Sequence, residues 1–338
     1  MVSKKWSPPP ELKNLDQRSA SNMVALKKEI QENKVTLALG SGVSASAGLP
    51  AWPEFLRILC ESFFWHWESR IETGSRTASL VPKNLSICGA VDEYLNCSGP
   101  IKEIADLLAT KDPLLVAQQI KNCIRPADWR YLCIKALNSN DDYETNTKSK
   151  IIGNLVKLCI KNKNLKTVIN YNYDNLFEIY LNRKKVKHTV IWEPRNRRYP
   201  TRIAIYHPHG CLPIKGGPSS DFVLAESDYY EEATKQYSWA NLIQSQLFGT
   251  SLCVFVGLSM TDPNIRRLLR ASLKVSTFTH YAFLPTSHHP KQAEIMLNAI
   301  FDNDLYKLGV KVIRYPKTYY KKNPYSRLTS LIGTLTSK

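Results

Sequence analysis

Two short polar segments contain the residue types that could perform acid–base chemistry. One reads Asn172-Tyr173-Asp174, and the other reads His207-Pro208-His209-Gly210. An imidazole exchanges protons near neutral pH, so a histidine can act as a general base on a hydroxyl group or a water molecule. A carboxamide both donates and accepts hydrogen bonds, so Asn172 could hold that hydroxyl or water in place. Read singly, Asn172 could instead be a turn former and Asp174 a helix N-cap.

Two glycine-bearing segments could hold a phosphate group. Each follows a short apolar run, and glycine lets the backbone approach a pyrophosphate because no Cβ is in the way. The segment after the first run could also present N–H groups and a helix N-terminus to negative charge. A tight turn packed with small residues would give the same pattern, and Asp262 could be only a helix cap. The candidate residues are Gly40, Ser41, Gly42 and Ser44 in the first segment, and Gly257, Ser259 and Asp262 in the second.

The elements that would position these segments alternate between strands and helices. Short apolar runs predict strands, and apolar residues spaced three and four apart predict helices. This alternation predicts an α/β fold: a Rossmann-like, doubly wound parallel sheet with helices on both faces. Because the carboxyl ends of parallel strands share one edge, the polar segments would line one cleft. The predicted strands are 35–39, 166–169, 202–206, 252–256, 279–284 and 310–315, and the predicted helices are 21–32, 151–160, 175–181, 229–248, 263–273 and 290–301.

Composition sets the domain organisation and the compartment that we expect. Residues 1–20 are predicted to be a flexible N-terminal arm, in which a run of prolines is locally stiff. Residues 21–338 are predicted to be one domain with a helical insertion at about 60–150. There is no long apolar run and no secretory signal, so we expect no membrane contact and a cytoplasmic location. The eight cysteines contain no CxxC pair, so we expect reduced thiols and no bound metal.

The formal net charge of +17 is high for a chain of 338 residues. This positive charge could attract a nucleic acid, an acidic protein partner or an anionic nucleotide. No helix-turn-helix or RNA-binding signature accompanies the lysines and arginines, so direct nucleic-acid binding stays possible without a motif that indicates it. The helical section and the proline-containing arm could be assembly surfaces, and we expect a homo-oligomer.

The polar segments, taken in chain order, resemble the motifs of the SIR2 superfamily. The segment Gly40-Ser41-Gly42-Val43-Ser44, continued by Gly48-Leu49-Pro50, is similar to the sirtuin Gly-Ala-Gly-x-Ser…Gly-Ile-Pro loop. Asn172-Tyr173-Asp174 is similar to the Asn-Ile-Asp motif, His209-Gly210 to the His-Gly motif, and Gly257-Leu258-Ser259 to the Gly-x-Ser motif. The resemblance covers about 33–315 without the helical insertion, and it implies that NAD is the substrate.

Two departures from the sirtuin pattern concern the binding of an acylated peptide. Where sirtuin deacylases have Asp-Phe-Arg, this chain has Ala51-Trp52-Pro53, and the two CxxC pairs of the zinc ribbon are missing. The chain therefore resembles the bacterial SIR2-like NAD hydrolases that act as effectors of antiphage defence. This resemblance implies an activatable NAD glycohydrolase that releases nicotinamide and ADP-ribose and needs no metal.

The resemblance also implies a role for each candidate residue. Asn172 and His209 would be catalytic, with His209 chosen over His207 because it directly precedes the glycine. Asp174 would contact the nicotinamide amide, the glycine loops would hold the pyrophosphate, and Ser44 and Ser259 would lie near phosphate or ribose. Trp52 could cover the reactive sugar and exclude water.

Other functions remain open at this point. The chain could be an NAD-dependent protein deacylase or ADP-ribosyltransferase, a non-catalytic subunit that senses NAD or ADP-ribose, or, with less support, an NAD oxidoreductase. An activating partner could be a helicase or ATPase, an Argonaute-like protein or a phage component. Nicotinamide release in the absence of a peptide distinguishes these alternatives.

Overall fold

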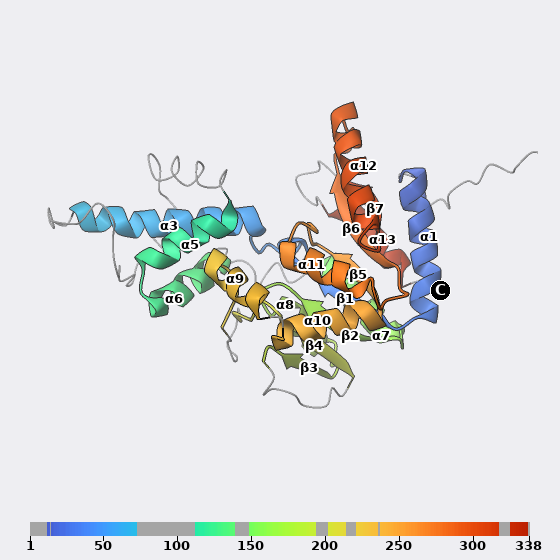
Figure 1. Ribbon diagram of the computed structural model, residues 1–338, viewed down its shortest axis with the longest axis horizontal. Helices are drawn as coiled ribbons and strands as arrows, with labels where there is room; N and C mark the ends of the chain where they lie inside the picture. The colour runs from blue at the N-terminus through green and yellow to red at the C-terminus, as the bar shows by residue number, and fades with distance from the viewer. Residues whose placement is uncertain are drawn as a thin grey trace, which may run out of the picture.

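A seven-stranded, all-parallel sheet forms the centre of the molecule, so the predicted α/β fold is confirmed (Figure 1). The computed structural model describes residues 12–13, 15–72, 112–138, 149–193, 202–213, 221–235, 237–317 and 325–336. The strand order across the sheet is β3-β4-β2-β1-β5-β6-β7. The strands are β1 (Val35–Leu39), β2 (Leu165–Asn170), β3 (His188–Ile191), β4 (Ile203–Tyr206), β5 (Leu252–Val256), β6 (His280–Thr286) and β7 (Val310–Pro316).

The direction in which the chain extends the sheet reverses beside β1. From β1 the chain adds β2, β3 and β4 on one side, and it then returns to place β5 on the other side. At the carboxyl end, Leu39 of β1 is in register with Asn170 of β2 and with Val256 of β5. Open α/β sheets bind ligands outside the carboxyl ends of their strands at such a switch point. The polar segments that follow β1, β2 and β5 therefore meet where a ligand is expected.

Helices cover both faces of the sheet and bury its strands. Successive residues of β1 enter different cores, because side chains alternate across a strand: Leu37 packs with one helical layer and Ala38 with the other. The first layer contains α1 (Gln17–Glu32), α7 (Lys150–Lys161), α8 (Leu176–Arg183) and α13 (Ser326–Thr334). The second layer contains α10 (Trp239–Thr250), α11 (Pro263–Ser272) and α12 (Gln292–Tyr306).

A third core lies beside the sheet and is built from helices (Figure 1). It joins α3 (Trp52–Glu72), α5 (Pro113–Cys123) and α6 (Pro126–Leu137), and the segment after β4 adds Leu212 and Leu224. Lys121 of α5 pairs with Asp228 of α9 (Glu226–Thr234) at 2.5 Å. The described parts of the predicted insertion at 60–150 are thus helical, and 73–111 and 139–148 lie outside the described residues.

The structure differs from the predicted elements in several places, among them helix α13, which was not predicted. The single helix predicted at 229–248 is two helices, α9 and α10, because Ser238 accepts a hydrogen bond from the Asn241 amide and starts a new helix there. Strand β3 was not predicted, since it is short, lies at the sheet edge and buries only Ile191. Helix α1 begins at Gln17, inside the range read as an arm.

No helix in the part of the chain that the structure describes is both long enough and apolar enough to cross a membrane.

Candidate active site

A cavity of about 770 Å³ opens at the carboxyl edge of the sheet. Its wall runs from the start of α3, across the ends of β1, β2, β4 and β5, to the ends of β6 and β7. This volume lies within the range of roughly 300–1,000 Å³ typical of ligand pockets. Every residue predicted for the site lines it: Gly40, Ser41, Gly42, Ser44, Trp52, Asn172, Asp174, His209, Gly257, Ser259 and Asp262.

The two glycine segments pack directly against each other at the switch point. The Gly42 N–H donates to the Gly257 carbonyl at 3.0 Å, and a Cβ on Gly40 would lie 2.6 Å from that same oxygen. Gly257 itself has a φ of 73°, which favours glycine. The glycines therefore allow close approach of two backbones. Because the Gly42 and Val43 amides already donate within the protein, other groups of the loop would have to contact a ligand.

Ser44 joins the two polar residues of the segment after β2. The Asn172 side-chain amide donates to Ser44 Oγ at 2.9 Å, and the Ser44 hydroxyl interacts with the Asp174 carboxylate. All three side chains are buried. Burial raises the pKa of Asp174 to about 6, although hydrogen bonds from Ser44 and from the Leu176 amide oppose the shift. Ser44 thus links Asn172 to Asp174, and because it also lines the cavity, its place near phosphate or ribose stays a prediction.

His209 reaches the cavity from the turn after β4, where Gly210 adopts a φ of 82°. The His209 ring lies edge-on to Tyr171 and Tyr229, with ring centroids 5.2 and 5.6 Å away. Burial lowers its pKa, and the Asp262 carboxylate, 3.9 Å from Nε2, opposes this shift. A lowered pKa favours the neutral imidazole at pH 7, which is the form that can accept a proton.

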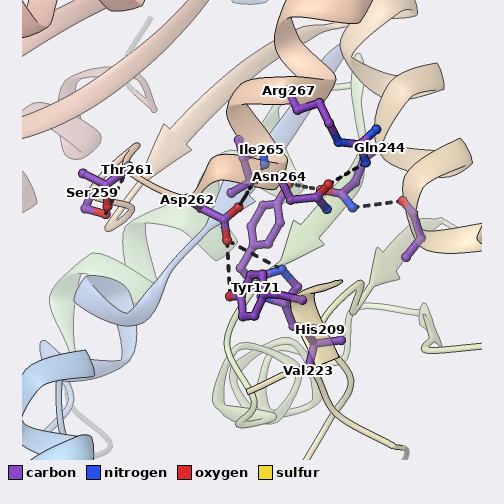
Figure 2. Close-up of polar contacts among 12 residues, drawn as sticks. Tyr171, His209, Val223, Gln244, Ser259, Thr261, Asp262, Asn264, Ile265 and Arg267 are labelled. Atoms are coloured by element: carbon purple, nitrogen blue, oxygen red, sulfur yellow. Dashed lines mark hydrogen bonds and ion pairs between the residues drawn. The ribbon is translucent and has the colours of Figure 1, made fainter. Parts of the chain in front are cut away.

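Asp262 connects His209 to the first turn of α11. Its carboxylate accepts the amides of Asn264 and Ile265 at 2.8 and 3.0 Å and the Tyr229 hydroxyl at 3.3 Å. Figure 2 shows this carboxylate between the helix end and the His209–Tyr171 pair. In the same view, Ser259 lies away from the His209–Asp262 pair, and its hydroxyl is hydrogen-bonded to the Thr261 hydroxyl, with 2.6 Å between the oxygens. Asp262 is therefore both the predicted helix cap and a neighbour of His209.

The other candidate histidine, His207, is fully buried below the cavity. Its Nε2 lies 2.7 Å from Glu178 Oε1, and its Nδ1 lies 3.1 Å from the Asn172 carbonyl oxygen. Burial, the largest single effect, lowers the pKa of His207, but the charge and hydrogen bond of Glu178, with the Asn172 carbonyl and the Asp174 carboxylate, together raise it. Both partners are acceptors, so the protonated ring donates to each of them. His207 thus fixes the backbone beside Asn172 and does not line the cavity.

Phe55, Tyr173 and Lys317 also line the cavity and were not predicted as site residues from the sequence, whereas Trp52 was. Trp52 stacks on Phe55 at 5.8 Å and lies 6.5 Å from Tyr173, so one end of the cavity has an aromatic wall. Among the described lining residues, Lys317 is the one lysine or arginine. The aromatic residues on either side of Asn172 were a visible signal, whereas nothing in the sequence connects Lys317 to this site. No group of three or more His, Cys, Asp or Glu side chains suited to a metal occurs among the described residues.

One comparison with known proteins, a family-model match, bears on this geometry. No curated protein matches the sequence. Residues 166–301 match the family model of the SIR2-like domain, a range that runs from β2 through the turn of His209 and the Gly257–Asp262 corner into α12. This match over part of the chain, together with the parallel sheet that carries it, supports a relationship to the SIR2 superfamily.

Proposed function

We propose that this protein is an NAD glycohydrolase that cleaves the nicotinamide–ribose bond and releases nicotinamide and ADP-ribose. The family match supports an NAD-related activity. The observation that carries the finer proposal is the single cavity that contains Asn172, Asp174 and His209 together with both glycine corners. These groups come from segments far apart in the chain, and each follows a strand of the sheet.

The reaction needs orientation and charge stabilisation more than a strong acid. Departure of nicotinamide, a neutral leaving group, builds positive charge on the ribose, as in glycoside hydrolysis. The Asn172 amide can orient the attacking water or a ribose hydroxyl, and the neutral imidazole of His209 can accept its proton. Carboxylates near the sugar, Asp174 and Asp262, can stabilise the developing cation. The aromatic wall at Trp52 can limit access of bulk water to the reacting sugar.

The remaining lining groups suit the rest of the dinucleotide. Lys317 can neutralise a phosphate, and the glycine corners at Gly40 and Gly257 line the same cavity. The cavity extends from the aromatic wall to Lys317, so an elongated ligand could contact both.

Nicotinamide release from NAD by the purified chain, without any peptide, tests the proposal. We expect Asn172→Ala and His209→Ala each to lower the rate by about 100-fold or more, a typical loss for a positioned general base or its partner. Asn303→Ala and His289→Ala are matched controls, because both residues are exposed and neither lines the cavity. Turnover that requires an acylated lysine peptide would instead favour a deacylase.

We also propose that the activity is held in check until a partner or a homo-oligomer forms, since unrestrained NAD loss would harm the cell that makes the enzyme. An antiphage role would follow if the activator is a phage component or a helicase, ATPase or Argonaute-like partner. If the purified chain shows no turnover without a partner, calorimetric titration measures whether it binds ADP-ribose. Absence of both turnover and ADP-ribose binding would contradict the proposal, while binding without turnover under any partner would favour a sensing subunit.

A further inference from the structure

The amino edge of the sheet, opposite the cavity, carries a row of exposed cations. Because all strands are parallel, the residues that precede them lie at one edge. Lys34 precedes β1, Lys163 and Lys166 lie at the start of β2, Arg202 precedes β4, and Lys187 precedes β3. Lys185 occupies the turn just before Lys187 with a φ of 53°. We call these six residues the basic edge; all six are exposed.

The register of the strands shows that the basic edge is continuous. Val35 of β1 is level with Leu165 of β2, Thr167 of β2 with Ala204 of β4, and Ile203 of β4 with His188 of β3. The cations beside these positions therefore follow the sheet order β1-β2-β4-β3, with neighbouring strands about 4.8 Å apart. Figure 1 shows β3 and β4 at the margin of the sheet, where this row ends.

The cations of the basic edge have no acidic partners in the described part of the chain. None of the described ion pairs involves them. Within 149–193 and 202–213 the acidic residues are Asp174 and Glu178, which are buried, and Glu193, which follows the opposite end of β3. Arg202 alone uses its charge locally, by donating to the Ile160 carbonyl at 2.9 Å. Near Lys34, the exposed Glu32 pairs with Lys28 and not with a cation of the basic edge, so the edge keeps a net positive charge.

A hollow at the β3 end of the row could receive an anionic group. It has a volume of about 360 Å³ and is lined by Asn182, Lys185, Val186, Lys187 and His188. Two ammonium groups, an amide and an imidazole around one hollow are donors suited to phosphate oxygens. His188 Nδ1 already faces the Val186 carbonyl at 2.9 Å, so its other nitrogen is the one that could face a ligand.

We propose that the basic edge binds the phosphate backbone of duplex nucleic acid without reading its sequence. An acidic protein surface is the less suitable partner, because protein interfaces have an apolar core, and Ile160 is the one exposed large apolar side chain within 149–193 and 202–213. The half-buried aromatic residues of the same ranges, Tyr173, Trp192 and Tyr206, lie toward the carboxyl ends of their strands and away from the basic edge, so unpaired bases have no ring to stack on there and a duplex fits better than a single strand. A row of lysines without base-reading groups gives sequence-independent, salt-dependent binding.

Fluorescence anisotropy with a labelled duplex of arbitrary sequence, over a salt series, tests the proposal on the full chain. The variant Lys166→Gln/Lys187→Gln should weaken binding by about tenfold and reduce the slope of log K against log salt by about two, one for each lost phosphate contact. The control variant Lys150→Gln/Lys291→Gln makes the same change in net charge at exposed positions away from the basic edge and should keep the slope. Equal effects of both variants would overturn the proposal, as would absence of duplex binding at low salt.

Two further measurements distinguish duplex binding from binding of an acidic protein and from the proposed catalytic function. In a competition experiment, polyglutamate and unlabelled duplex are each used to displace the protein from the labelled duplex. If polyglutamate competes more effectively, the partner is an acidic protein and the proposal is overturned. Nicotinamide release or ADP-ribose binding should be unchanged in Lys166→Gln/Lys187→Gln, since neither residue lines the cavity. Failure at the basic edge is thus distinguishable from failure of the proposed catalytic function.

Discussion

At the scale of single residues, the site contains polar groups whose pKa values are shifted by burial. His209 and Asp174 line the same cavity, yet burial acts on them in opposite directions. It lowers the pKa of the imidazole and raises the pKa of the carboxyl group, because each neutral form is favoured away from water. Near pH 6 to 7 a neutral base would therefore lie in a cavity with a carboxyl group that is still partly protonated.

The raised pKa of Asp174 predicts how stability depends on pH. A carboxyl group that titrates at about 6 when folded, against roughly 3.9 when unfolded, favours the folded state below pH 4 and loses this contribution as pH rises through 6. We expect wild-type stability relative to Asp174→Asn to fall between pH 4 and pH 7 by about 2–3 kcal/mol. Urea unfolding of both proteins across this range measures the difference. A difference that stays constant with pH would show that Asp174 titrates normally.

At the scale of elements, the predictions succeeded where a buried strand leads directly into a polar turn. The run before Gly257 is apolar at every position and the run before Gly40 at every position but Thr36, and their strands β1 and β5 are fully buried. Strand β3 was not predicted because its sequence shows no clear apolar pattern. It forms a strand because it pairs with β4. The split between α9 and α10 likewise depends on Ser238 accepting the Asn241 amide, a local bond that an apolar period does not reveal.

The role of glycine in the corners could not be read from the sequence, because it depends on a contact across the sheet. Gly257 has a positive φ, and a Cβ there would lie 2.6 Å from the Val43 nitrogen and 2.9 Å from the Gly40 oxygen. Gly257→Ala should therefore destabilise the fold by about 2 kcal/mol or more. Gly153→Ala is the matched control: its Cβ would meet nothing within 4 Å, and alanine in a helix should stabilise by up to about 1 kcal/mol. Thermal or urea unfolding gives both values, and equal effects would refute the steric role of Gly257.

At the scale of the whole molecule, three hydrophobic cores meet around one cavity. The sheet supplies two cores, one on each face, and the helices α3, α5 and α6 supply the third. Sequence patterns predicted the sheet and its carboxyl edge. They predicted Trp52 for the site, but they could not predict that it packs with Phe55 and Tyr173 as an aromatic wall, because those contacts depend on how the third core packs beside the strands. The basic edge was likewise hidden, since its lysines are spread along the chain and gather only through strand register.

The limits of the folded unit give a last prediction. Leu12 and Leu15 precede α1, within the range read as a flexible arm, yet they are 4% and 8% exposed and belong to the same core as Leu26 and Ile30. The sequence pattern missed this because two leucines among polar residues and prolines show no period. Leu15→Ala should lower the free energy of unfolding by about 2 kcal/mol or more, as removal of a buried leucine side chain does.

The control for this prediction is Leu297→Ala on α12, where the side chain is 67% exposed and the change should stay within about 0.5 kcal/mol. Urea denaturation of both variants under the same conditions compares them directly. If Leu15→Ala were as mild as Leu297→Ala, the folded unit would begin at α1, and the segment before it would add nothing to stability. A large effect would instead show that the chain before α1 is part of the core that supports β1, the strand from which the first glycine corner emerges.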